Sequence, residues 1–95
     1  MHTIESDDYE WDSGKALNNF RKHRVRFSEA AAALRDPDAI SRQDPDSNGE
    51  LRYLSLAMGP MGRILVTVFT FRGEKVRIIS ARRATPGERR RYRQR

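Results

Sequence analysis

The sequence predicts an α+β protein in which two N-terminal helices precede an antiparallel sheet of three to four strands in a meander and a C-terminal helix. Three observations support this prediction. Apolar residues recur at helical spacing before residue 36, three runs with a period of two follow residue 51, and a helix start stands at 85–88. A chain of 95 residues can bury only one small core, so a single domain over 1–95 is expected.

The first two helices are predicted from their caps and composition. The first runs over about 13–23, with Asp12 as N-cap and Phe20 on its apolar side. Ser28 is expected to cap the second helix, EAAAALR, whose alanines favour helix until the Asp-Pro pair at 36–37 stops it. The stretch that follows, DPDAISRQDPDSNGE, is rich in turn-forming residues and predicts a loop with at most a brief strand near Ile40.

Three strands are predicted after residue 51, in the runs LRYLSLAM, ILVTVFTF and KVRIIS. Their connections, GPMG and RGE, are short enough for an antiparallel meander. In the middle run, apolar residues fall on both faces, which predicts a central strand that is covered on both sides, with the two N-terminal helices on one of them. The residues of one face are Ile64, Val66 and Val68, and those of the other are Leu65, Phe69 and Phe71.

The third helix begins with a complete start signal. Thr85 is the expected N-cap, Pro86 occupies the first helical position, and Glu88 stands three residues on as the capping-box partner. Apart from Tyr92 the helix offers no large apolar side chain, and its arginines repel one another. We therefore expect that a ligand explains this excess of arginine.

Charge is divided unevenly along the chain, whose net charge is +6. Residues 1–50 carry 7 Lys and Arg against 11 Asp and Glu, whereas residues 72–95 carry 10 against 2. Such a local excess of positive charge is typical of a surface that binds a polyanion, most often nucleic acid. A solvated basic tail is the simpler alternative.

Several classes of site are excluded by what the sequence lacks. The absence of cysteine removes thiolate metal sites and disulfides, and two separate histidines do not make a metal site, so no metal and no cofactor are expected. No phosphate-binding loop and no nucleophile elbow occurs. The acidic N-terminus does not resemble a signal peptide and no apolar run could span a bilayer, so a cytoplasmic protein is expected, with residues 1–8 flexible.

The remaining candidates for chemistry are cations and a few proton-transfer groups. RNA cleavage can proceed from these alone, because the 2′-hydroxyl lies beside the scissile phosphate and a positioned arginine can stabilise the charge that develops. Each proton-transfer candidate also has a structural interpretation: His23 as a cation at a helix end, Glu88 as a cap, and Tyr92 as a packing residue. The cations that could hold a phosphate are Lys22, His23, Arg77, Arg82, Arg83 and Arg89.

Four segments, in order, resemble the BrnT family of type II toxins over about residues 9–92. They are WDSGKALNNFRKHRVRF, GELRYLSLAMG, RIISARRAT and ERRRY. The resemblance implies a RelE-like fold and a metal-independent endoribonuclease that cleaves RNA through its 2′-hydroxyl and inhibits translation. One departure stands out, because Arg24 occupies the position at which the family usually has glycine. A left-handed helix end there would lose its easiest residue, and His23 could sit differently.

Residues are carried over from the family only where the motifs match. Trp11 and Asp12 match the family's WD motif, and Lys15 and Asn19 match polar positions of its first helix. Glu50 matches together with Arg52, and Ser80 matches together with Arg77 and Arg82. The implied catalytic set is Lys22, His23, Arg52, Arg77, Arg82, Glu88 and Tyr92, with the general base left open. The residues expected to bind RNA are Arg83, Arg89, Arg90 and Arg93.

The resemblance also implies a partner, a BrnA-like antitoxin with a ribbon-helix-helix DNA-binding domain. Its acidic segment would cover the basic C-terminal surface, operator DNA would be bound only through the antitoxin, and a homodimer could form within the complex. Two alternatives remain open at this point. The basic surface could bind nucleic acid without catalysis, or it could dock an acidic protein.

Overall fold

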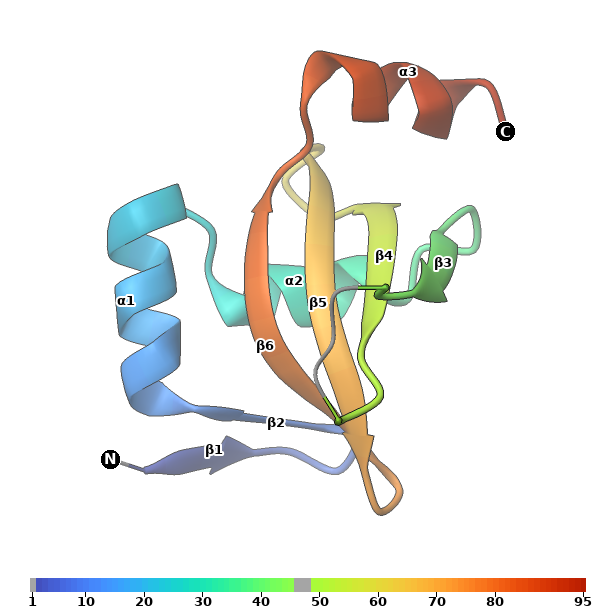
Figure 1. Cartoon of the computed structure of the whole chain (residues 1–95). Coiled ribbons are helices and arrows are strands. Elements are labelled where there is room, and N and C mark those ends of the chain that lie inside the picture. Colours follow the sequence, from blue (N-terminus) through green and yellow to red (C-terminus); the bar gives the residue numbers. More distant parts are fainter. Residues whose placement is uncertain (1, 46–48) are drawn as a thin grey trace.

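The computed structural model describes residues 2–45 and 49–95 and contains three helices and six strands in those ranges (Figure 1). The strands and helices, in chain order, are β1 (Thr3–Glu5), β2 (Tyr9–Asp12), α1 (Ser13–His23), α2 (Phe27–Ala33), β3 (Ile40–Gln43), β4 (Tyr53–Met58), β5 (Ile64–Arg72), β6 (Lys75–Arg83) and α3 (Pro86–Arg93). The predicted α+β class and the predicted meander over β4, β5 and β6 are confirmed. The middle of the predicted loop, residues 46–48, lies outside the described residues.

The sheet is larger than predicted and mixed rather than antiparallel. Its strand order is β1-β2-β6-β5-β4-β3, and β2 runs parallel to β6 while every other neighbouring pair is antiparallel. The expected order, with helices first and three to four strands in a RelE-like meander, was therefore wrong. The two N-terminal strands are short, and their pairing joins Tyr9 to Val76, a contact that no local sequence pattern indicates. The segment 1–8, expected to be flexible, contains β1, while Met1 lies outside the described residues.

Two of the three helices in the described ranges begin at the caps that the sequence predicts. Asp12 caps α1 by accepting a hydrogen bond from the Lys15 N–H (2.9 Å), as predicted. Ser28 does not cap α2, because the helix begins at Phe27, whose ring is 2% exposed, and burial of that ring places the start earlier. The capping box between Thr85 and Glu88 opens α3 as predicted. None of the helices in the described ranges combines the length and the apolar character needed to cross a lipid bilayer.

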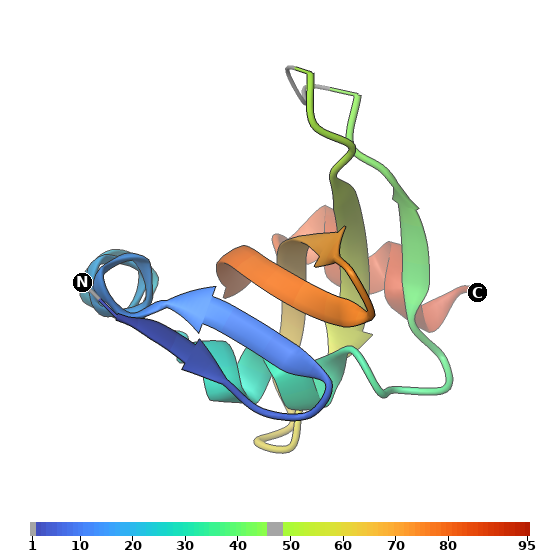
Figure 2. The same ribbon diagram turned by 90° about the horizontal axis from the view of Figure 1, so that it is seen from below.

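Helices cover both faces of the central strands, as the sequence predicted. Figure 1 shows α2 behind β5 and β6, α1 alongside β6 and α3 across the upper end of the strands. Figure 2, seen from below, shows α1 end on and α2 on the side of the sheet away from α3. One core cluster joins α1 and α2 to the sheet through Phe27, Leu65 and Ile78, and a second joins α3 to the other face through Ile64 and Tyr92.

A β-bulge in β6 sets the direction of its arginines. Val68 lies opposite Ser80, but Phe69 lies opposite Ile78, so Ile79 is an additional residue without a partner in the register. Residues on one side of such a bulge change face relative to those on the other. Arg77 and Arg82, which are an odd number of residues apart, consequently project from the same face of the sheet, the face that α3 partly covers.

The outer edge of β6 is completed by a side chain rather than by a strand. β2 pairs with β6 only at Val76 and Arg77, which leaves the edge open at Ala81. The buried Asn19 amide of α1 donates to the Ala81 carbonyl (2.8 Å) and the Val25 carbonyl (3.0 Å), and its oxygen accepts from the Ala81 N–H (3.1 Å). Asn19 therefore provides the hydrogen bonds that a neighbouring strand would otherwise make.

Arg24 ends α1 in the left-handed conformation, with φ 58° and ψ 30°, and its N–H donates to the Phe20 carbonyl (2.8 Å). Among the described non-glycine residues it is the only one with positive φ. The left-handed helix end thus forms although the residue is not glycine.

We predict that Asn19→Ala lowers the free energy of unfolding by about 3 kcal/mol, because two carbonyls and one N–H would be left buried without partners. Urea denaturation checks this. Asn18→Ala is the matched control, since Asn18 is an exposed neighbour on the same helix and its loss is expected to cost less than about 0.5 kcal/mol. Equal losses in the two variants would contradict the prediction.

We predict that Arg24→Gly raises the free energy of unfolding by about 1 kcal/mol, because glycine adopts the left-handed conformation without steric cost. Arg24→Ala is the control, since it removes the same side chain but keeps the Cβ that causes the cost. Thermal denaturation compares the two. If both variants melt together, the left-handed backbone is not the source of strain.

Candidate active site

The sheet face beneath α3 gathers three of the predicted catalytic residues. Arg77 and Arg82 project from β6 on this face, and Glu88 reaches it from the first turn of α3. Ser80 lies on the same face between them and is half-buried. The bulge at Ile79 places the two arginines on one face of the sheet, because in a regular strand they would point to opposite faces.

Arg82 and Glu88 form a two-pronged ion pair. Nη1 and Nη2 of Arg82 donate to the two carboxylate oxygens of Glu88 at 2.8 Å and 3.0 Å, and Nη1 also donates to the Arg83 carbonyl at 3.2 Å. The hydrogen bonds that Arg82 donates to Glu88 raise the pKa of Arg82, against the opposing effect of burial. The guanidinium is therefore fixed in both charge and orientation, while 41% of the side chain remains exposed.

Glu88 is held as an anion by the same contacts. The hydrogen bond from Arg82, with further hydrogen bonds from Thr85, lowers its pKa from the usual 4.5 to about 2, although burial acts in the opposite direction. A carboxylate with so low a pKa is a weak base at neutral pH. Its geometry therefore suits a group that positions Arg82 rather than one that takes a proton.

Tyr92 anchors α3 to the rest of the protein. Its ring is buried in the second core cluster, and its hydroxyl donates to Asp36 Oδ2 at 2.5 Å. That hydrogen bond raises the pKa of Tyr92, and burial adds to the effect. Tyr92 therefore directs its hydroxyl to the segment after α2, while Glu88, one turn earlier on the same helix, points to the sheet.

Asp36 receives hydrogen bonds from several directions. Burial raises the pKa of its carboxyl, but hydrogen bonds from the Tyr92 hydroxyl and from the N–H groups of Met58 and Asp38, together with the charge of Arg95, hold it below the usual value. This carboxylate consequently joins α3, β4 and the turn after α2. It fixes the helix that carries the C-terminal arginines.

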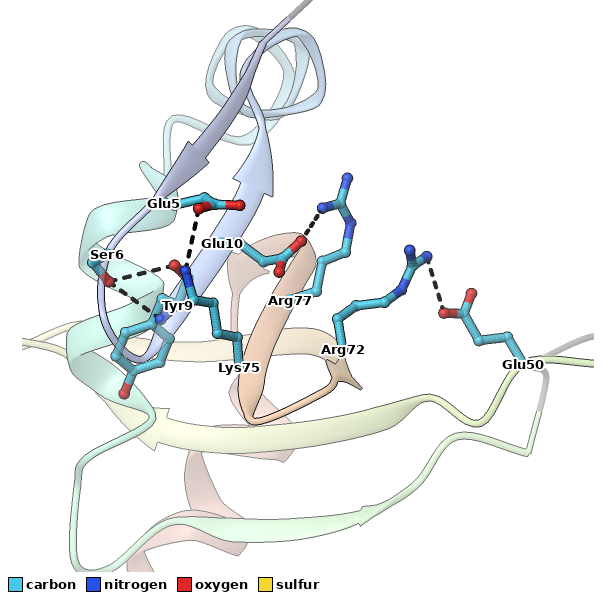
Figure 3. A network of polar contacts seen from close by, with 8 residues as sticks. All are labelled: Glu5, Ser6, Tyr9, Glu10, Glu50, Arg72, Lys75 and Arg77. Atoms are coloured by element: carbon cyan, nitrogen blue, oxygen red, sulfur yellow. Dashed lines mark hydrogen bonds and ion pairs between the residues drawn. The ribbon is translucent and has the colours of Figure 1, made fainter.

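Arg77 forms one of several separate ion pairs at the other end of the sheet, where Figure 3 shows Glu5 with Lys75, Glu10 with Arg77 and Glu50 with Arg72. It donates to Glu10 of β2, and both side chains are largely buried. Arg52, which precedes β4, lies 4.0 Å from Glu50, and Arg72 lies 3.3 Å from the same glutamate. Arg52 and Arg77 therefore both have acidic partners. Within the part of the chain that the structure describes, neither contacts the Arg82–Glu88 pair.

Lys22 and His23 occupy the last turn of α1, on the side of β6 from which Asn19 reaches Ala81. Lys22 is exposed and His23 is half-buried. Across residues 2–45 and 49–95, no hydrogen bond or ion pair joins this pair to the other predicted catalytic residues. The structure therefore does not bring the predicted catalytic set into one group.

The four residues predicted to bind RNA share one property. Within the described ranges, no carboxylate lies at ion-pair distance from them, unlike Arg52, Arg77 and Arg82. Three of them line a hollow of about 250 Å³ beside the exit of β6, at the base of which the Arg89 guanidinium donates to the Ala84 carbonyl. The four residues are Arg83, Arg89, Arg90 and Arg93.

Three side chains at the site were not predicted. Glu10 became visible only through the parallel pairing of β2 with β6. Arg42 of β3 and Arg91 of α3 line a small hollow of about 60 Å³ next to Glu88, although the sequence around Arg42 predicted a loop with a brief strand. The brief strand predicted near Ile40 was the one local signal for Arg42. Among the described residues, no group of three or more acidic, histidine or cysteine side chains is placed to hold a metal ion.

We predict that Glu88 contributes stability that is fully present above pH 4.5 and is lost as the pH falls toward about 2, because folding lowers its pKa. Glu88→Gln keeps a capping-box side chain but removes the charge, so its free energy of unfolding should fall less over that range. Urea denaturation of both proteins at several pH values measures the difference. Parallel pH curves would show that the ion pair does not contribute.

Comparisons with known proteins point to one family. A family model described as "Ribonuclease toxin, BrnT, of type II toxin-antitoxin system" matches residues 11–88. The crystal structure of the Brucella abortus ribonuclease toxin BrnT is similar, with a TM-score of 0.58 and 22% sequence identity over 79% of this chain and 92% of that chain. At that identity the structural likeness supports the fold. No curated protein matches the sequence significantly.

Proposed function

Because the chain belongs to the BrnT family of ribonuclease toxins of type II toxin–antitoxin systems, we propose that it is an endoribonuclease that cleaves RNA without a metal ion. The RNA 2′-hydroxyl loses its proton as its oxygen attacks the adjacent phosphorus, and the bond from phosphorus to the 5′-oxygen of the next nucleotide breaks. That 5′-oxygen takes up a proton and leaves as a hydroxyl, and a 2′,3′-cyclic phosphate remains. The observation that carries this proposal is the Arg82–Glu88 pair on the sheet face, with unpaired arginines of α3 beside it.

The geometry of Arg82 supports a role in binding the phosphorane. A guanidinium has five N–H donors, and three of them are used on Glu88 and the Arg83 carbonyl. The two that remain are Nε–H and the outer Nη2–H, which form one edge of the planar group. That edge matches two phosphate oxygens, and its charge is fixed before substrate binds.

Proton transfer in this reaction requires a base near the 2′-hydroxyl and an acid near the leaving oxygen. Both oxygens of Glu88 accept hydrogen bonds from Arg82, and the Tyr92 hydroxyl donates a hydrogen bond to Asp36. His23 carries the one imidazole of the predicted set, the side chain that most often transfers protons near neutral pH. We keep Lys22 and His23 as candidates whose role is tested by substitution.

Membership of a type II toxin–antitoxin family implies an antitoxin partner. We propose that this partner is BrnA-like, with a ribbon-helix-helix domain that binds operator DNA, and that its acidic segment covers the unpaired arginines of α3. Inhibition then follows from occupancy, since RNA phosphates and acidic side chains would compete for the same cations. We further propose that the toxin acts in the cytoplasm, inhibits translation by cutting RNA, and can form a dimer within the complex.

We predict that purified protein in EDTA cuts naked single-stranded RNA and leaves 2′,3′-cyclic phosphate ends, and that Arg82→Ala lowers the rate at least about a hundredfold. Arg35→Ala is the control, because Arg35 is exposed and paired with Asp8 at the end of α2. End mapping and initial rates measure the outcome.

The alternative functions give different results in the same experiment. Intact RNA with tight and salt-sensitive binding would favour a noncatalytic nucleic-acid-binding protein. Intact RNA without binding, together with capture of an acidic antitoxin, would favour a protein-interaction module. Cuts that require added metal would contradict the metal-independent mechanism.

A further inference from the structure

Another hollow, of about 330 Å³, lies between the turn that joins α1 to α2 and the turn that joins β4 to β5. None of the residues that line it belongs to the predicted catalytic or RNA-binding sets. Those that matter for its chemistry are Phe20, Arg24, Arg26, Glu29, Met61 and Arg63.

The base of this hollow is electrically neutral and rigid. Arg63 donates through Nε and Nη2 to the two oxygens of the buried Glu29, at 2.9 Å and 2.5 Å, and through Nη2 to the Arg24 carbonyl at 3.0 Å. These bonds fasten the β4–β5 turn to the α1–α2 turn. Because the charge of Glu29 is balanced, the base does not repel an anion.

The wall of the hollow carries an aromatic ring between two cations. The guanidinium carbon of Arg26 lies 4.3 Å from the centroid of the Phe20 ring, and that of Arg24 lies 5.4 Å from it. In the described part of the chain, neither arginine has a carboxylate at ion-pair distance. Arg24 moreover has a left-handed backbone, which is strained for a residue other than glycine. Such strain persists where the surroundings or the function require it.

This hollow is connected to the arginines of α3. Arg63 lines both it and the hollow formed by Arg83, Arg89 and Arg93 at the exit of β6. A phosphate backbone that crosses the α3 arginines would therefore meet the Phe20 ring on the other side of Arg63. A flat ring beside cations suits single-stranded nucleic acid, because a base can stack on the ring while the phosphates meet the cations.

We propose that this hollow binds one nucleotide of single-stranded RNA next to the cleavage site, with its base on the Phe20–Arg26 pair and its phosphate at Arg24. The inference rests on the proposed ribonuclease function and extends it with a stacking subsite. An acidic peptide is a less suitable occupant, because its carboxylates would use the two cations but would place no flat group on the Phe20–Arg26 pair.

The experiment measures fluorescence anisotropy of a labelled 2′-O-methyl RNA of about eight nucleotides, which cannot be cleaved because the attacking hydroxyl is blocked. An abasic oligomer of the same length is the second probe. The variants are Phe20→Leu, which removes the ring but keeps an apolar side chain, and Arg26→Gln and Arg24→Gly, which each remove one cation. Arg35→Gln is the control for loss of a charge elsewhere.

We expect Phe20→Leu to weaken binding of the RNA roughly tenfold and to leave binding of the abasic oligomer unchanged, since stacking requires a base. Arg26→Gln and Arg24→Gly should reduce the slope of log affinity against log salt by about 0.7 each, while Arg35→Gln should not change it. Arg24→Gly is informative in addition because it should be more stable than wild type, so weaker binding cannot be attributed to unfolding.

Unchanged RNA binding in all three variants, while the wild type still cleaves RNA, would overturn the stacking subsite and leave the proposed function intact. Unchanged RNA binding combined with loss of affinity for polyglutamate would likewise overturn it and assign the hollow to an acidic protein. A wild-type protein that neither binds nor cuts RNA would refute the proposed function itself, and the subsite with it.

Discussion

The hydrogen bonds between the Asn19 amide and the backbone at Ala81 are the constraint on which the rest of the structure depends. β6 pairs in parallel with β2 on one side and antiparallel with β5 on the other, yet β2 covers only the beginning of its outer edge. One buried side chain completes that edge, attaches α1 to the sheet and holds the turn after α1 through the Val25 carbonyl. Arg82 follows Ala81 directly, so its place on the sheet face depends on the same three bonds.

The charges of this protein separate into two populations with different uses. On the sheet face, Arg77 and Arg82 each form an ion pair with a glutamate. The glutamate fixes the direction of the guanidinium and neutralises part of its positive potential. The arginines of α3 and of the α1–α2 turn have no acidic partner among the described residues, so their field extends into solvent. Paired cations suit the orientation of one phosphate, whereas unpaired cations suit attraction of a polyanion and competition with an acidic inhibitor.

The bulge at Ile79 links the pattern of the sequence to the geometry of the site. Without the additional residue, Arg77 and Arg82 would lie on opposite faces, and one of them would enter the core that α1 and α2 cover. With it, Ile78 and Ala81 both lie in that core while both arginines face the other side. A single inserted residue thus allows one strand to contribute to the first core cluster on both sides of the bulge and to present both arginines on the opposite face.

The sequence by itself determined the elements that depend on neighbours in the chain. The caps at Asp12 and Thr85, the central strand with two apolar faces and the meander follow from local hydrogen bonds and from periodicity. The start of α2 did not, because burial of Phe27 outweighed the cap expected at Ser28. Arg82 and Glu88, six residues apart, were both recognised as site residues. Their ion pair could not be predicted, because it depends on the direction in which α3 leaves the sheet.

What only the tertiary structure decided is the set of contacts between distant segments. Glu10 meets Arg77, Asn19 meets Ala81, and Tyr92 meets Asp36, each across more than fifty residues of chain. The parallel pairing of β2 with β6 and the bulge in β6 were likewise decided by the tertiary structure, because neither leaves a mark on the composition of a strand. Local patterns record which face of an element is apolar, but they do not record which element that face meets, and a site assembled from several elements is fixed only when those contacts form.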